Sequence, residues 1–193
     1  PVLMYHHINP HKGDIVTIRP EVFEAQMKHL KKRGIRTLTA GELESYINGD
    51  LVLDRKSVVI TFDDGWLDNY IYAFPVLKKY KLNAIVFIIT NRTESASANT
   101  GNTGTAIPTH DESKKLISNG EGDRVVLDWK LIKEMYDSGL VEFYSHTKSH
   151  RRCAELSETE LAEELKGSKD IMESRQQMPC PYLCWPYGSY NET

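Results

Sequence analysis

The chain has 193 residues, 40% of them hydrophobic and 26% charged, which allows one well-buried domain and excludes two domains of typical size. Its formal net charge of −3 argues against a nucleic-acid or anionic-membrane partner, because such partners usually select a basic surface. No apolar run reaches the length of a transmembrane helix. The three cysteines, Cys153, Cys180 and Cys184, lack the spacing of a zinc finger or a disulfide framework. We expect free or buried thiols, with a strained Cys180–Cys184 bridge as the alternative.

Strand and helix patterns alternate along the chain, and this order predicts a parallel sheet flanked by helices. Two of the expected helices start with a capping box, Thr39 with Glu42 and Ser157 with Glu160. Strands are predicted at 2–5, 35–38, 58–62, 84–89, 140–144 and 182–185, and helices at 20–33, 40–48, 67–80, 129–138 and 158–176. This order gives about six βα units, a number between that of an open sheet and that of a closed barrel.

The predicted strand at 58–62 ends in an unusual way. Its apolar, β-branched run is typical of a strand buried on both faces, yet it stops on Asp63 and Asp64, and Gly65 then permits a tight turn. α/β folds place their functional groups at this end of a strand. The alternative is that Asp64 only caps the helix beginning near Leu67.

Histidines follow two other predicted strands. His6 and His7 end the first strand, and His146 and His150 follow the strand at 140–144. Each could be an ordinary surface or half-buried histidine. Because the carboxyl ends of parallel strands lie on one rim, His146, His150 and a carboxylate could instead form a three-ligand metal site. Such a site suits Zn²⁺, with Co²⁺, Ni²⁺ or Fe²⁺ as substitutes.

Residues 91–125 are rich in Thr, Ser, Asn and Gly and show little apolar periodicity. We expect a long loop here, either functional or disordered, that shapes one wall of a groove. His110 and Asp111 within it are expected to be solvated.

Two of these stretches resemble motifs of the polysaccharide deacetylases, the NodB-like domain of carbohydrate esterase family 4. Thr61-Phe62-Asp63-Asp64-Gly65 is similar to the first motif of the family, and His146-Thr147-Lys148-Ser149-His150 is similar to its H-[ST]-x-x-H second motif. The resemblance implies that Asp63 is the general base. It also implies that Asp64, His146 and His150 hold a divalent metal.

The third motif of the family, R-x-P-Y, is matched only in part. Cys184-Trp185-Pro186-Tyr187-Gly188 keeps Pro186 and Tyr187, but Cys184 stands where the family has an arginine that steadies the base. Tyr187 would offer its backbone N–H to an oxyanion, and Pro186 is expected beside it among the residues that contact substrate. Four aromatic residues next to the motifs are candidates to stack on sugar rings, with core packing as the alternative: Trp66, Tyr144, Trp185 and Tyr187.

The closing motif of the family, L-x-x-H, is found at the start of the chain as Leu3-Met4-Tyr5-His6. This order is similar to the circularly permuted branch that includes the poly-β-1,6-N-acetylglucosamine N-deacetylases. It implies that His6 is the general acid and leaves His7 a neighbour of undefined role. The resemblance covers almost the whole chain as one domain, 1–193. A family domain would continue beyond Thr193, so we expect a domain truncated at its C-terminal end.

The sequence therefore predicts an α/β protein, a distorted (β/α) barrel of about six to seven βα units that is incomplete at its C-terminal end. The expected activity is metal-dependent removal of N-acetyl groups from a β-linked N-acetylglucosamine polysaccharide, first of all poly-β-1,6-N-acetylglucosamine, outside the cell or at the cell envelope. Peptidoglycan and chitin are alternative substrates. A non-catalytic carbohydrate-binding relic of the fold and an unrelated metal hydrolase are the other interpretations. The sequence indicates no particular protein partner.

Overall fold

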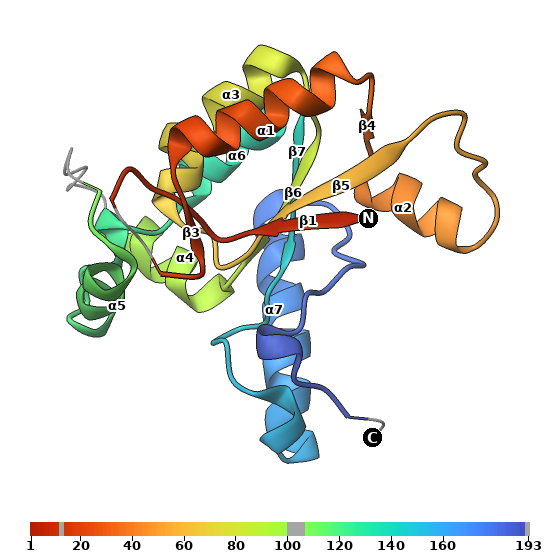
Figure 1. Ribbon diagram of the computed structural model, residues 1–193. Coiled ribbons are helices and arrows are strands. Elements are labelled where there is room, and N and C mark those ends of the chain that lie inside the picture. The colour runs from red at the N-terminus through yellow and green to blue at the C-terminus, as the bar shows by residue number, and fades with distance from the viewer. Residues whose placement is uncertain (12–13, 100–106, 192–193) are drawn as a thin grey trace.

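A parallel sheet forms the centre of the protein, for which a computed structural model describes residues 1–11, 14–99 and 107–191 (Figure 1). The strand order is β1 (Val2–Tyr5), β5 (Ser57–Phe62), β6 (Ala84–Ile88) and β7 (Val141–Ser145), and β4 (Arg36–Thr37) pairs with the start of β5. A separate parallel pair joins β2 (His7–Ile8) to β3 (Thr17–Ile18). The expected α/β class with a parallel sheet is confirmed. Within the described residues β1 and β7 do not pair, so the sheet is not closed there.

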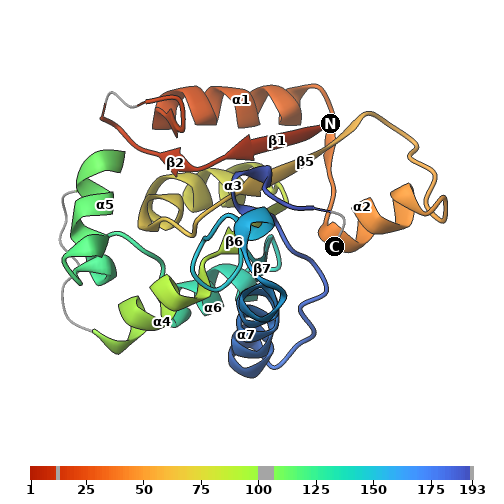
Figure 2. The same ribbon diagram turned by 90° about the horizontal axis from the view of Figure 1, so that it is seen from below.

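Helices surround the sheet, as Figures 1 and 2 show. They are α1 (Pro20–Lys32), α2 (Ala40–Ile47), α3 (Phe74–Tyr80), α4 (Thr90–Ala98), α5 (His110–Ser118), α6 (Trp129–Asp137) and α7 (Glu158–Gln176). Both capping boxes expected from the sequence are present, at the starts of α2 and α7. None of the described helices combines the length and apolar character that crossing a bilayer requires.

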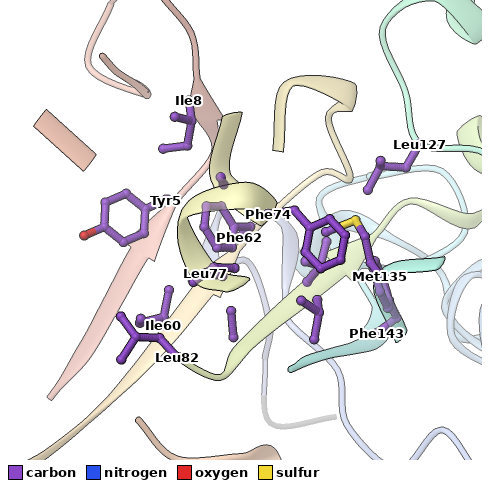
Figure 3. Close-up of a cluster of buried hydrophobic side chains, with 14 of the residues drawn as sticks. Tyr5, Ile8, Ile60, Phe62, Phe74, Leu77, Leu82, Leu127, Met135 and Phe143 are labelled. Carbon is purple, nitrogen blue, oxygen red and sulfur yellow. The ribbon is translucent and has the colours of Figure 1, made fainter. Parts of the chain in front are cut away.

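Strand β5 is buried on both of its faces, as its sequence predicted. Alternate side chains of a strand point to opposite faces. Ile60 and Phe62 therefore join the main hydrophobic core against α1, α3 and α6, where Figure 3 shows them beside Leu77 and Phe74. Val59 joins a smaller core on the opposite face, with residues of α2 and β6.

The turn after β5 requires Gly65. Its φ is +73°, and a Cβ atom placed there would lie 2.9 Å from Cγ2 of Ile88 on β6. The chain then forms a π-helical turn, Asn69–Ala73, which leads into α3, so the expected helix at 67–80 begins as a different helix type. Asp64 does not cap this helix, because its N-cap residue is Asp68.

The expected strand at 182–185 is reduced to one bridge, between Leu183 and Ser145 of β7. Pro181 and Pro186 flank this segment, and proline cannot donate to a strand ladder.

The expectation of a long loop at 91–125 is wrong for the part that the structure describes. Helices α4 and α5 and a 3₁₀ turn, Gly122–Arg124, occupy it, while residues 100–106 lie outside the described part of the chain. Helix α4 buries only Thr90, Thr93 and Ala96, so it has no large apolar stripe to indicate it. Helix α5 starts with a capping box, Thr109 with Glu112, which was visible in the sequence.

Candidate active site

The carboxyl ends of β1, β5 and β7 meet at one rim of the sheet. His6 follows β1, Asp63 and Asp64 follow β5, and His146 and His150 lie in the loop after β7. All five line one cavity of about 650 Å³. The structure therefore brings together every residue that the sequence proposed for acid–base catalysis and metal binding.

Asp64, His146 and His150 form a cluster that could hold a metal ion. Their candidate ligand atoms all lie within 4.8 Å of one another. Nε2 of His150 is 3.2 Å, and Nε2 of His146 is 3.8 Å, from Oδ1 of Asp64. One carboxylate and two imidazoles leave open coordination positions, as catalytic metal sites do.

Hydrogen bonds from neighbouring groups occupy the outer atoms of this cluster and leave its candidate metal-binding atoms available. Nδ1 of His146 is 2.8 Å from the carbonyl oxygen of Cys184, so Nδ1 carries the proton and Nε2 keeps its lone pair. Trp66 donates from Nε1 to Oδ2 of Asp64 at 3.0 Å, while Oδ1 of Asp64 is buried and has no hydrogen-bond partner among the described residues. A buried carboxylate oxygen without a donor is costly unless a cation binds it. The donor set therefore fits a divalent metal.

The protonation states of these three side chains also favour metal binding. Burial lowers the pKa of His150 to about 4 and also lowers the pKa of His146, so both rings are neutral at neutral pH. Burial acts to raise the pKa of Asp64, but the two neighbouring imidazoles and Arg92 outweigh it, and the pKa lies below its ordinary value. Neutral imidazole and ionised carboxylate are the forms that bind metals.

The loop at 146–150 is held in place by helix α7. Glu164, which is 5% exposed, accepts a hydrogen bond from the backbone N–H of Ser149 at 2.8 Å and another from the Ser149 hydroxyl. The hydroxyl groups of Ser168 and Ser145 are 2.6 Å apart at the start of the loop. The sequence predicted α7, but it did not distinguish Glu164 from the other glutamates of that helix.

Asp63 is the second carboxylate of the cavity and is 4% exposed. Nε2 of His6 lies 4.0 Å from its Oδ2, and the Cys184 thiol donates to the same oxygen with Sγ at 3.7 Å. Burial raises the pKa of Asp63 to about 6, against the opposing influence of His6. A carboxyl group that titrates close to neutrality suits proton transfer.

The position of His6 depends on the turn after β5. The side-chain amide of Asn69 donates to the carbonyl oxygen of His6 at 2.8 Å, and Asn69 is fully buried. This bond ties the end of β1 to the π-helical turn, which the register of β1 against β5 already brings close. The His6 side chain is 23% exposed, so it faces the cavity.

Three of the residues proposed to contact substrate lie together in the segment after Leu183. Tyr187 is 62% exposed, and its ring centroid is 4.7 Å from that of His150. Trp185 is half-buried and lines the cavity, whereas Pro186 between them in the sequence is buried. The N–H of Tyr187 belongs to the first turn of a short helix, where N–H groups lack partners within the helix.

Trp66 does not offer a surface for sugar stacking, which corrects the expectation from the sequence. It is 2% exposed, and its ring stacks on His7 with centroids 4.2 Å apart. Its indole N–H is used by Asp64. Trp66 therefore orients the carboxylate of the cluster.

Sequence reasoning missed a buried hydrogen-bonded chain beside the cavity. His7 joins Asp68 to His110, with Nδ1 2.7 Å from Oδ2 of Asp68 and Nε2 3.0 Å from Nδ1 of His110. The His110 side chain is only 18% exposed, so the expectation that it is solvated is wrong, whereas Asp111 beside it is exposed. The capping box at Thr109 was the signal that could have placed His110 on a helix.

Arg92 is a second residue that the sequence did not identify. It lines the cavity from α4, and its guanidinium lies over the ring of Trp66, 5.8 Å from the ring centroid. No described carboxylate lies within ion-pair distance of it. Burial lowers its pKa, although the nearby Asp64 opposes this effect.

Backbone strain is concentrated at this site. Only a few non-glycine residues of the described chain have positive φ, and two of these, Lys81 and Gln177, simply end helices. The other four belong to the site segments: Asp64, Thr147, His150 and Tyr187. Left-handed conformations at such residues persist where the surrounding structure enforces them, and they cluster at functional sites.

Comparison with known proteins gives a consistent result. A sequence profile described as polysaccharide deacetylase matches residues 51–193. YxkH of Bacillus subtilis (strain 168), a protein classed with the polysaccharide deacetylases, is 32% identical over 192 residues, which are 100% of this chain and 58% of that protein. The poly-β-1,6-N-acetyl-D-glucosamine N-deacetylase of Staphylococcus epidermidis is 29% identical over 186 residues, 91% of this chain and 55% of that protein. The chain thus spans little more than half the length of these relatives.

Among solved structures, the deacetylase PplD of Streptococcus pyogenes in complex with acetate aligns with 100% of this chain and 75% of its own. The TM-score is 0.81 and the sequence identity is 26%. The range matched by the family profile includes Asp63 and the cluster of Asp64, His146 and His150. His6 lies before the start of that range. The profile covers well over half of the sequence, and this chain belongs to the polysaccharide deacetylase family.

Proposed function

We propose that this chain is a metal-dependent hydrolase that removes N-acetyl groups from a β-linked N-acetylglucosamine polysaccharide and releases acetate. One observation carries the proposal. Asp63 and His6, a carboxylate and an imidazole 4.0 Å apart, line the same cavity as the cluster of Asp64, His146 and His150. Hydrolysis of an amide requires a base for the water and an acid for the leaving amine, and this pair supplies both.

Asp64, His146 and His150 would hold the metal, for which Zn²⁺ is the best candidate, with Co²⁺, Ni²⁺ or Fe²⁺ as substitutes. A metal bound there would polarise the acetamide carbonyl and lower the pKa of a water molecule. The buried Oδ1 of Asp64 and the lone pair on Nε2 of His146 support this assignment.

The acid–base steps are assigned to the chain's own side chains. Asp63 takes a proton from the attacking water as the C–O bond to the acetamide carbon forms. The backbone N–H of Tyr187 donates to the developing oxyanion. His6, in its imidazolium form, protonates the amine as the C–N bond breaks. Acetic acid and a free amino sugar leave, and the second proton of the water is released when the acid ionises to acetate. The proton held by Asp63 then passes to His6, so both side chains return to their starting forms.

Poly-β-1,6-N-acetylglucosamine is the proposed polymer because the Staphylococcus epidermidis relative is named for it. Exposed Tyr187 and half-buried Trp185 at the cavity support a sugar-binding wall. Such a polymer lies outside the cytoplasmic membrane, so we place the protein outside the cell or at the cell envelope.

Acetate release from poly-β-1,6-N-acetylglucosamine, peptidoglycan and chitin, measured with Zn²⁺-loaded protein, tests this proposal. The first polymer should give the highest kcat/KM. Release from peptidoglycan alone would overturn the choice of polymer but leave the chemistry intact. A protein that binds no Zn²⁺ or Co²⁺ and releases acetate from none of the three would instead be a non-catalytic relic of the fold.

A further inference from the structure

A hydrogen-bonded relay connects a fully buried carboxylate to the wall of the cavity. Asp68 is 2% exposed, and its Oδ2 lies 2.7 Å from Nδ1 of His7, which is 1% exposed. Nε2 of His7 lies 3.0 Å from Nδ1 of His110, the first residue of α5. His110 lines the same cavity as Asp64 and His6. The mechanism proposed above uses none of the three relay residues.

The relay is held in one geometry by its surroundings. The ring of His7 stacks on Trp66, and the ring of His110 meets Trp66 edge-on with centroids 5.8 Å apart. The side chain of Asn9 donates to the carbonyl oxygen of Pro108 at 2.7 Å, which fixes the segment just before α5. His110 is therefore presented on a rigid support, as a substrate-contacting group requires.

Only one nitrogen of His110 is available to a ligand. Nδ1 is used by His7, and Nε2 has no hydrogen bond within the described residues, since Oδ2 of Asp14 is 3.9 Å away. Whether Nε2 of His110 donates or accepts depends on the tautomers of the two rings, because Nε2 of His7 can either donate to Nδ1 of His110 or accept from it. A hydroxyl group satisfies Nε2 in both arrangements, since it can donate and accept.

We propose that Nε2 of His110 binds a hydroxyl group of the glycan, and that His7 and Asp68 act as positioning residues that fix the ring of His110. This assignment rests on the proposed function, which it deepens by adding a sugar contact on the α5 side of the cavity. Asp14 lies beside the same position, so a hydroxyl there would have a second acceptor.

The test compares a β-1,6-linked N-acetylglucosamine pentamer with a small aryl acetate, which has no sugar hydroxyl. His110→Ala should raise KM for the pentamer about 3- to 10-fold, the range of one hydrogen bond, and leave the aryl acetate kinetics unchanged. His110→Gln should recover part of the loss, because its amide can reach the position of Nε2. Lys115→Ala, on the outer side of the same helix, is the matched control and should behave as the native protein.

A separate measurement tests the positioning roles of Asp68 and His7. Asp68→Asn should raise KM for the pentamer, and the double variant with His110→Ala should show no further increase, because both changes remove one interaction. Calorimetry of pentamer binding to the metal-free proteins should give the same ranking: the native protein binds most tightly, and the single and double variants bind more weakly and equally. If the native protein releases no acetate, that result counts against the proposed function. The calorimetric measurement still tests the assignment of His110 in that case.

Two results would overturn the assignment of His110. One is an unchanged pentamer KM and affinity in His110→Ala. The other is an equal loss on both substrates together with a lower melting temperature, since that outcome describes a residue that only fastens α5 to β2. Failure of the native protein to bind the pentamer in either assay would also reject it.

Discussion

The Cys184 thiol donates to Oδ2 of Asp63 across 3.7 Å, at the position where the family motif has an arginine. Burial raises the pKa of Cys184 to about 12, so the thiol stays protonated and remains a donor. A thiol is a weak, neutral donor, whereas a guanidinium is a permanent cation. The carboxylate of Asp63 therefore lacks the stabilisation that an arginine would give, and burial raises its pKa to about 6.

Cys184→Arg should move the acidic limb of the kcat/KM profile to lower pH. A general base works in its ionised form, so activity of the native protein rises as pH increases through about 6. A guanidinium beside Asp63 favours the ionised form and lowers that midpoint. The measurement is kcat/KM against pH, with Cys153→Ala, a buried thiol away from the cavity, as the control. An unmoved midpoint in Cys184→Arg would show that the thiol contact does not tune the base.

Replacing each of the two adjacent aspartates by asparagine should impair a different property, catalysis for Asp63 and metal binding for Asp64. Asp63→Asn should lower kcat by a factor of about 10² to 10⁴, the usual contribution of a general base, and leave metal affinity nearly unchanged. Asp64→Asn should abolish tight metal binding, because it removes the one carboxylate of the cluster. Metal content after dialysis, measured beside acetate release, gives both readouts. Full activity in Asp63→Asn would reject the assignment of the base.

Metal should stabilise the folded protein through the same cluster. At a free Zn²⁺ concentration 100 times Kd, the free energy of unfolding should rise by about 2.7 kcal/mol, and a chelator should reverse the change. His150→Ala should lose most of this increment, because Nε2 of His150 is 3.2 Å from Oδ1 of Asp64. Urea unfolding with and without Zn²⁺ measures it. His29→Ala, on a helix remote from the cavity, should keep the full increment.

The five cavity residues could be predicted because each follows a strand with a strong apolar pattern. Parallel strands share one rim, so the ends of 2–5, 58–62 and 140–144 had to converge whatever the packing of the helices. The contact between His6 and Asp63 follows from that rule, since β1 pairs directly with β5.

The supporting residues depend on packing between distant segments, which local patterns do not show. Glu164 is one of several glutamates on α7, and only the docking of that helix on the loop at 146–150 selects it. Arg92 lies on a helix that buries small and polar side chains, so its sequence looks like that of a loop. His110 is the exception, because the local capping box of Thr109 and Glu112 indicates a helix that begins at His110.

Glu164→Ala should weaken metal binding without touching a ligand. Its carboxylate fixes Ser149, the residue before His150, through the backbone N–H and the hydroxyl. Loss of groups that orient metal ligands typically costs about 10- to 100-fold in metal affinity or activity. Zn²⁺ affinity measured by competition with a chelating dye is the readout. Asp170→Ala is the matched control, since Asp170 is exposed and pairs with Lys166 of the same helix rather than with the loop at 146–150, and it should keep the native affinity.

Gly65→Ala should destabilise the protein more than the same change at Gly34. Both glycines have positive φ, +73° and +64°, so each alanine incurs the left-handed penalty of about 1–2 kcal/mol. The new Cβ at Gly34 meets nothing within 4 Å, whereas at Gly65 it lies 2.9 Å from Cγ2 of Ile88 in the core. Overpacking of this kind adds about 1–3 kcal/mol to the loss. Urea unfolding of the two variants isolates the contact, and equal losses would show that β6 accommodates the added methyl group of Gly65→Ala without cost.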